Sequence, residues 1–178
     1  MPQTYAESQK QLTKESITES LFLLLKEKDY ATITVTDIAQ KAGVSRMAFY
    51  RHYRDKSQVI EEYTNKLYEA FFRKAQNLSV RTPETVSHEL VGYFDRHSGL
   101  FLESLERGYN QILFRLFSEA LGEFYNATVT WENYKGMRAY YWNTFMAAGL
   151  FFVLMDWIRR GKAESIEEMA QLVTEMNT

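Results

Sequence analysis

The sequence contains almost nothing that would interrupt a helix. Proline, which removes a backbone donor and breaks helices, occurs only at Pro2 and Pro83 in 178 residues. Along most of the chain the apolar residues recur every three or four positions, which is the period of a helix with one buried face, and not every second position as in a strand. We therefore predict an all-α protein of about nine helices.

Local start and stop signals divide this helical chain into two parts. Asp55, with Gln58 three residues later, is a capping pair that opens a long helix from about residue 56. Thr82 followed by Pro83 marks another helix start, so residues 77–81 form a loop. We predict a three-helix N-terminal domain over residues 8–55 and a larger helical domain over residues 56–178, with the long helix linking them.

The composition argues against several classes of site. Without any cysteine, the chain can form no disulfide, thiolate nucleophile or cysteine-based zinc site. The three histidines, His52, His88 and His97, are too few and too widely spaced for a metal site. There is also no glycine-rich phosphate loop and no nucleophile elbow. We expect no metal, no cofactor and no enzymatic activity.

Two segments bear on a membrane location, and neither supports one. Residues 1–14 are polar where a signal peptide would need an apolar run, so we expect a cytoplasmic protein. The stretch from Ala139 to Met155 is apolar, but it contains Asn143 and Thr144 and is barely long enough to span a bilayer. We interpret it as a helix buried in an interface, with no membrane contact.

Charge is distributed unevenly along the chain. The net charge is −2, yet residues 1–56 hold nine Lys and Arg against seven Asp and Glu. Between residues 32 and 56 there are five basic residues against two acidic ones. Such a local excess of positive charge is typical of a surface that binds a polyanion.

The segment from Val35 to Arg54 has the pattern of a helix-turn-helix. Ala39 allows two helices to cross closely, and Gly43, four residues later, permits the positive φ of the turn. The small core of this motif is predicted to consist of Ile38, Ala42, Val44, Phe49 and Tyr53. The second helix, capped by Ser45, then presents four side chains outward: Arg46, Met47, Tyr50 and Arg51.

That outward face suits DNA in two ways. Arg46 is the best candidate for a bidentate contact with guanine. Lys56 lies in the first turn of the next helix, where backbone N–H groups and the helix dipole favour a phosphate. Pairs of helices with the same Ala-x-x-x-Gly spacing also occur in bundles that bind nothing. The caps at Thr34, Ser45 and Asp55 and the local basic charge favour the DNA-binding interpretation.

These residues resemble the tetracycline-repressor (TetR) family of bacterial regulators across residues 12–60. The similarity lies in TVTDIA from Thr34, AGVS from Ala42, FYRHY from Phe49, and Lys56. It implies a fold of nine or so helices in which Thr36, Ser45, Arg46 and Met47 lie toward bases. It also implies phosphate contacts by Thr34, Tyr50, His52 and Lys56. Many relatives carry Thr or Ser at the position of Ala48, so a hydroxyl contact is missing here.

The C-terminal part resembles short members of the family more loosely. Helices over residues 131–160 and 165–176 have second apolar stripes that the remaining chain cannot cover, so we predict a homodimer through residues 131–176 that binds a palindromic operator. The family resemblance suggests a small-molecule effector, whose cavity would be lined by Tyr93, Phe94, His97, Tyr109, Phe117, Tyr141, Trp142 and Phe145. Phe114 and Tyr125 are further aromatic residues that could line this cavity. The alternative for each is ordinary core packing.

Three functions remain open at this point. The default is a repressor released by an effector. An activator or co-regulator controlled by a partner protein fits the same residues. A helical protein-interaction module is the third, and it predicts no DNA affinity at any salt concentration.

Overall fold

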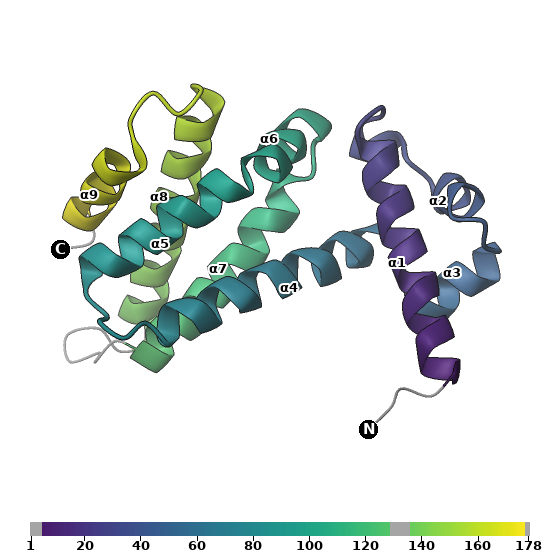
Figure 1. Cartoon of the computed structure of the whole chain (residues 1–178), viewed down its shortest axis with the longest axis horizontal. Coiled ribbons are helices and arrows are strands. Elements are labelled where there is room, and N and C mark those ends of the chain that lie inside the picture. Colours follow the sequence, from purple (N-terminus) through teal and green to yellow (C-terminus); the bar gives the residue numbers. More distant parts are fainter. Residues whose placement is uncertain (1–4, 129–135, 177–178) are drawn as a thin grey trace.

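The computed structural model describes residues 5–128 and 136–176, and every regular element in these ranges is helical (Figure 1). This confirms the all-α prediction. The helices are α1 (Tyr5–Leu25), the 3-10 helix η1 (Tyr30–Thr32), α2 (Val35–Lys41), α3 (Arg46–His52), α4 (Lys56–Gln76), α5 (Pro83–Arg96), α6 (Ser98–Arg107), α7 (Asn110–Thr128), α8 (Met137–Arg159) and α9 (Ile166–Met176).

The first three helices form a small head at one end of the molecule. Helix α2 packs against both α1 and α3, and α4, which contacts α1, runs from this head into the rest of the chain (Figure 1). Apolar side chains fill the space between the three helices: Ile17, Leu21, Ile38, Phe49 and Tyr53. Of the five residues predicted for the motif's core, Ala42 and Val44 are half-buried and the other three are buried.

Helices α4 to α9 form the larger body. The main contacts pair α5 with α9, α4 with α7, and α7 with α8. The high aromatic content of the sequence is concentrated here. Phe94 and Phe101 stack with ring centroids 4.2 Å apart, and Phe117 and Phe151 meet Phe94 edge to face. This aromatic cluster is buried and holds α5, α6, α7 and α8 together.

Most helices begin where the capping residues predict. Thr34 and Asp37 form a reciprocal capping box, and Thr82 caps α5 with Pro83 at its first position. Ser165 and Glu168 exchange the same two hydrogen bonds before α9. Asp55 accepts from the Gln58 backbone N–H at 3.0 Å, but the Gln58 side chain accepts from Arg54 instead of Asp55. The helix expected over residues 131–160 begins at Met137, and residues 131–135 lie outside the described part.

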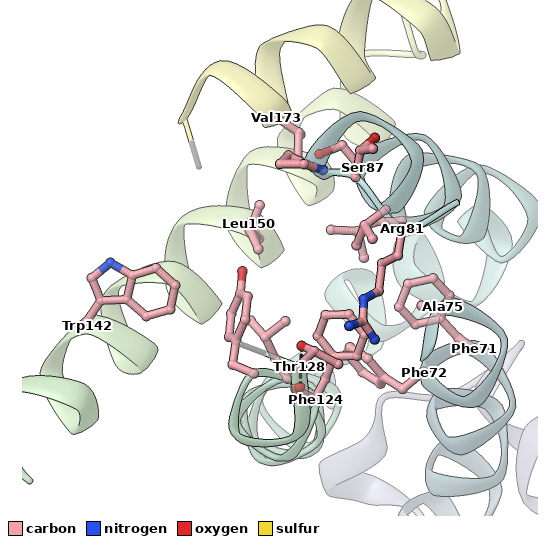
Figure 2. A pocket seen from close by; sticks show the side chains of 16 residues that line it. Phe71, Phe72, Ala75, Arg81, Ser87, Phe124, Thr128, Trp142, Leu150 and Val173 are labelled. Atoms are coloured by element: carbon pink, nitrogen blue, oxygen red, sulfur yellow. Dashed lines mark hydrogen bonds between the residues drawn. The ribbon is translucent and has the colours of Figure 1, made fainter. Parts of the chain in front are cut away.

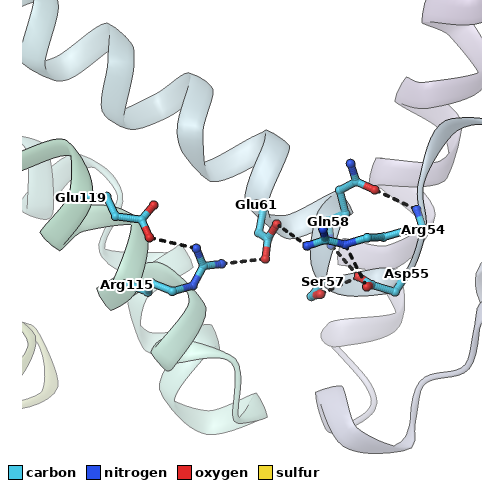
Figure 3. A network of polar contacts seen from close by, with 7 residues as sticks. All are labelled: Arg54, Asp55, Ser57, Gln58, Glu61, Arg115 and Glu119. Atoms are coloured by element: carbon cyan, nitrogen blue, oxygen red, sulfur yellow. Dashed lines mark hydrogen bonds and ion pairs between the residues drawn. The ribbon is translucent and has the colours of Figure 1, made fainter.

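Polar contacts tie the head to the body along α4 (Figure 3). Glu61 of α4 accepts from Arg115 of α7 at 2.7 Å. Its carboxylate also lies 3.6 Å from the guanidinium of Arg54, near the end of the head. On the other side, Arg107 at the end of α6 donates to the carbonyl of Lys26 at 2.8 Å and lies 3.6 Å from Asp29. A movement of α6 or α7 would therefore alter these charged contacts with the head.

Two further properties of residues 5–128 and 136–176 bear on function. None of the helices in these ranges is both long enough and apolar enough to cross a membrane. Nor do three or more His, Asp or Glu side chains of these ranges gather in a way that could hold a metal ion.

Candidate functional site

The second helix of the motif is fixed by its N-terminal turn. Gly43 has φ of +67°, a left-handed conformation that side chains with a Cβ rarely adopt. Ser45 then accepts a hydrogen bond from the Ala48 backbone N–H at 3.1 Å and starts α3. From inside, Phe49 and Tyr53 anchor the helix, with ring centroids 5.8 Å apart. Helix α3 is therefore short but rigidly held.

The opposite face of α3 is open to solvent. Met47 is 75% exposed and Tyr50 is 46% exposed, while Arg46 and Arg51 are also exposed. In the described part of the chain, neither arginine makes an ion pair, nor does the exposed Lys41 at the end of α2. Thr36, in the first turn of α2, is exposed as well. The side chains predicted to lie toward bases are thus accessible, and the cations among them are not neutralised by the protein.

Two of the residues predicted to hold phosphates have partners within the protein. The Thr34 hydroxyl accepts from the Asp37 N–H and donates to the Asp37 carboxylate at 2.7 Å; this donation and that of the Thr34 backbone N–H lower the pKa of the Asp37 carboxyl. The Lys56 ammonium donates to the carbonyls of Tyr30 at 2.5 Å and Ile33 at 2.6 Å. It also lies 4.3 Å from the centre of the Tyr30 ring. Lys56 therefore holds the loop before α2, and its contact with a phosphate stays a prediction.

His52, another predicted phosphate ligand, borders an open hollow between α1 and α3. Lys10, Thr13 and Arg51 line the same hollow. The Nδ1 atom of His52 is buried and has no hydrogen-bond partner. Desolvation, followed by the nearby charges of Lys10, Lys14 and Arg51, lowers the pKa of His52. The ring is therefore mostly neutral near pH 7 and surrounded by positive charge, a setting in which an anion would favour its protonation.

The body contains a partly open cavity of about 330 Å³, lined by residues of α4, α5, α7, α8 and α9 and of the loop before α5 (Figure 2). Its walls are mainly apolar, with Phe71, Phe72, Leu121, Phe124 and Leu150 among them. The polar groups at its surface come from Arg81, Thr82, Ser87, Tyr125 and Thr128. Burial raises the pKa of Tyr125 to about 12, so this phenol is neutral. A cavity of this size and character suits a small apolar ligand.

The cavity lies elsewhere than the eight predicted ligand-binding residues suggest. Of these residues, Trp142 lines it, as does Tyr125 from the wider aromatic set. Tyr93, Phe94, Tyr109 and Phe117 are instead buried in the aromatic core, and Tyr141 and Phe145 are exposed on α8. His97 lies at the junction of α5 and α6, its ring 4.6 Å from that of Tyr93, and desolvation lowers its pKa.

The sequence prediction missed most of the residues that do form the cavity. Phe71, Phe72 and Ala75 lie near the end of α4, and Arg81 lies in the loop before α5. No local pattern separates them from ordinary core residues, because the cavity exists only where these segments meet α7 and α8. One signal was present: Arg81 is a cation that directly precedes the capping pair Thr82-Pro83.

A row of apolar side chains on α8 faces away from the body. Phe145 is 73% exposed and Tyr141 is 63% exposed, and Tyr140 and Phe152 are exposed as well. On the same helix, a Cβ added to Gly149 would meet no atom within 4 Å. The second stripe predicted for this helix is buried only in part: Ala147, Phe151, Leu154 and Ile158 are buried in the body, whereas Tyr140 and Thr144 near the start of the helix are exposed.

A rigid helix-turn-helix with an exposed cationic face, joined to a helical body with a cavity, defines a helix-turn-helix transcriptional regulator. Comparison with protein families agrees. Residues 17–63 match the N-terminal model of the bacterial regulatory proteins of the tetR family, and residues 81–178 match a transcriptional regulator C-terminal region. The chain belongs to the TetR family of transcriptional regulators. This family is not enzymatic, as the sequence led us to expect.

Individual relatives agree with this assignment. The HTH-type transcriptional regulator YxbF of Bacillus subtilis is 24% identical over 167 residues, which cover 90% of this chain and 43% of YxbF. The chain spans about half the length of the curated relatives it matches. The crystal structure of Lin0861 from Listeria innocua aligns with a TM-score of 0.75 at 19% identity, over 99% of this chain and 94% of that one. The repressor FadR of Thermus thermophilus, in complex with lauroyl-CoA, aligns with a TM-score of 0.56 at 19% identity, over 92% of each chain.

Proposed function

We propose that this regulator is a homodimeric repressor that binds a palindromic operator through α3 and releases it when a small effector fills the cavity. The observation that carries the DNA-binding part is the exposed face of α3, where Arg46 and Arg51 lack ion pairs within the described residues. A helix held this rigidly can enter the major groove without first being ordered.

The proposed contacts follow from exposure and chemistry. Thr36, Ser45, Arg46 and Met47 would lie toward bases, with the guanidinium of Arg46 reading a guanine. Phosphates would be held by Thr34, Tyr50, His52 and Lys56. Because the Thr34 and Lys56 side chains already have partners in the protein, we expect Tyr50 and His52 to contribute more to phosphate binding.

The exposed row on α8 supports the homodimer. Tyr141, Phe145 and Phe152 recur at helical spacing, and large apolar side chains exposed in a row are typical of an interface. Gly149 leaves room between them for a second helix to approach closely. Two copies related by a two-fold axis would cover these faces and present two α3 helices to a palindromic site.

Release by an effector is supported by the cavity and by the polar contacts between body and head. The cavity touches α7, and α7 carries Arg115, which donates to Glu61 of α4. A ligand that shifted α7 would change the position of α4 and the head. FadR of Thermus thermophilus, a repressor of the same family by name, was crystallised with lauroyl-CoA, a ligand that carries an apolar acyl chain, which supports this part of the proposal.

The DNA-binding part is tested by selecting sites from a genomic fragment library with the purified protein at several salt concentrations. We expect recovery of a palindromic site whose affinity falls steeply with salt. Arg46→Ala should relax specificity at one base pair, at a cost of about 1–3 kcal/mol for the preferred base. Arg73→Ala, on an exposed position of α4 away from α3, is the matched control. Without even weak, salt-sensitive DNA binding, the chain would instead be a protein-interaction module.

The dimer and the sign of regulation need separate tests. Phe145→Asp should convert the protein to a monomer in sedimentation experiments, whereas Leu105→Asp, at an exposed apolar position on α6, should leave its mass unchanged. A monomeric wild type would remove the homodimer from the proposal. Transcription from the recovered operator should fall when the protein is added, and a rise would identify an activator or co-regulator.

A further inference from the structure

One charged side chain lines the cavity of the body, and it is exposed at the edge of the cavity. Of the described residues that line it, Arg81 alone is charged at neutral pH. Within the part of the chain that the structure describes, its guanidinium makes no ion pair and no hydrogen bond. Figure 2 shows the side chain reaching from the loop before α5 toward Phe72 and Phe124.

An arginine in this position is set to recognise one kind of group. A guanidinium binds a carboxylate through two parallel N–H···O bonds, and this fork-to-fork geometry favours planar anions. Arg81 is exposed at the edge of the cavity, so the carboxylate of a ligand would lie at the cavity mouth and its apolar part inside. The Ser87 side chain, also on the cavity wall, is buried and makes no hydrogen bond in the described part of the chain.

The remaining walls set the size and character of the rest of the ligand. The rest of the described lining is uncharged, and much of it is the apolar surface of Phe71, Leu90, Leu121 and Leu150. The volume of about 330 Å³ is at the lower end of the range for small-molecule sites, so the ligand is small. We infer that the cavity binds an apolar chain of about this size that ends in a single carboxylate, with Arg81 holding the carboxylate. This inference rests on the proposed function for its regulatory meaning, because the ligand would be the effector.

The experiment uses the full chain without DNA and compares decanoate with decanol by titration calorimetry. We expect decanoate to bind at least about threefold more tightly than decanol. Arg81→Gln should weaken decanoate by about three- to tenfold, as expected for the loss of a solvent-exposed charge-assisted pair, and change decanol by less than about twofold. Arg73→Gln, on the exposed side of α4, is the matched control and should change neither ligand.

The location of binding is read separately from the emission of Trp142, which lines the cavity. Decanoate should change the tryptophan emission of the wild type, and Trp142→Phe should abolish that change while calorimetry still detects binding. Equal affinities for decanoate and decanol, or equal losses of both in Arg81→Gln, would overturn the inference. So would the absence of decanoate binding at millimolar concentration, or tighter binding of lauroyl-CoA that depends on Arg81.

The same samples separate this inference from the proposed function. Adding decanoate to the complex with the selected operator should lower the DNA affinity of the wild type and leave that of Arg81→Gln nearly unchanged. If the protein binds no DNA but calorimetry gives the pattern above, the proposed function fails and the carboxylate site stands. If DNA binds and decanoate does not, the carboxylate site fails and DNA recognition stands.

Discussion

The head and the body of this protein obtain their sites in different ways. In the head, the twenty residues from Val35 to Arg54 supply the turn, the cap, the buried anchors and the exposed face of α3. In the body, one cavity is assembled from five helices and a loop that are up to a hundred residues apart in sequence. A site built within one short segment can be recognised from spacing alone, whereas a site built between segments depends on how they pack.

The largest expected effect tests whether the head is a separate unit. Phe49 is fully buried between α1, α2 and α3, so Phe49→Ala should lower the free energy of unfolding of the head by about 3–5 kcal/mol. DNA binding should be lost, and decanoate affinity should stay within about threefold. Chemical denaturation and calorimetry measure the two effects, with Met47→Ala on the exposed face as the stability control. Equal loss of ligand binding would show that the two regions fold as one.

A smaller effect tests whether the backbone of the turn is as important as the motif predicts. Gly43→Ala places a Cβ at φ of +67° and should destabilise the protein by about 1 kcal/mol. The same change at Gly99, which lies in α6 with open space around it, should stabilise by about 0.5–1 kcal/mol. Thermal unfolding of the two variants gives the comparison. A stabilising Gly43→Ala would contradict the role of this glycine.

The link between the two regions is expected to contribute less to stability. Glu61 is mostly shielded and Arg115 is half exposed, so a double-mutant cycle with Glu61→Gln and Arg115→Gln should give a coupling energy of about 0.2–1 kcal/mol. The matched cycle pairs Arg115 with Glu119, which is more exposed, and should give a smaller value. If the order of the two coupling energies were reversed, Glu61 would not be the main partner of Arg115 in solution.

The last prediction concerns binding in place of stability, namely the pH dependence of DNA binding. The pKa of His52 is lowered in the free protein, and a phosphate beside it would favour the protonated ring, so binding takes up a proton. DNA affinity should therefore rise as the pH falls from neutrality toward the lowered pKa, by about two- to tenfold. His52→Gln should remove this dependence, and His88→Gln, on the exposed face of α5, should keep it. Unchanged pH dependence in His52→Gln would exclude a phosphate contact by this ring.

Sequence alone determined the all-α fold and the arrangement of the head. The reason is that helix caps, a positive-φ glycine and the 3.6-residue period all act within a few residues of one another. Thr34, Gly43, Ser45 and Phe49 therefore have the roles that their spacing predicts. One detail in this region escaped prediction: the Lys56 ammonium turns to the carbonyls of Tyr30 and Ile33, because η1 brings them close to the start of α4.

Tertiary structure alone decided which aromatic side chains of the body are core, cavity wall or exposed face. Phe94, Phe117 and Phe145 are chemically alike and all lie on amphipathic helices, yet the first two are buried and the third is exposed. Their environments depend on the rotation of each helix about its axis and on which neighbour it meets, and no short segment encodes either. The position of Arg81 beside the cavity follows in the same way from the packing of α4, α5 and α7.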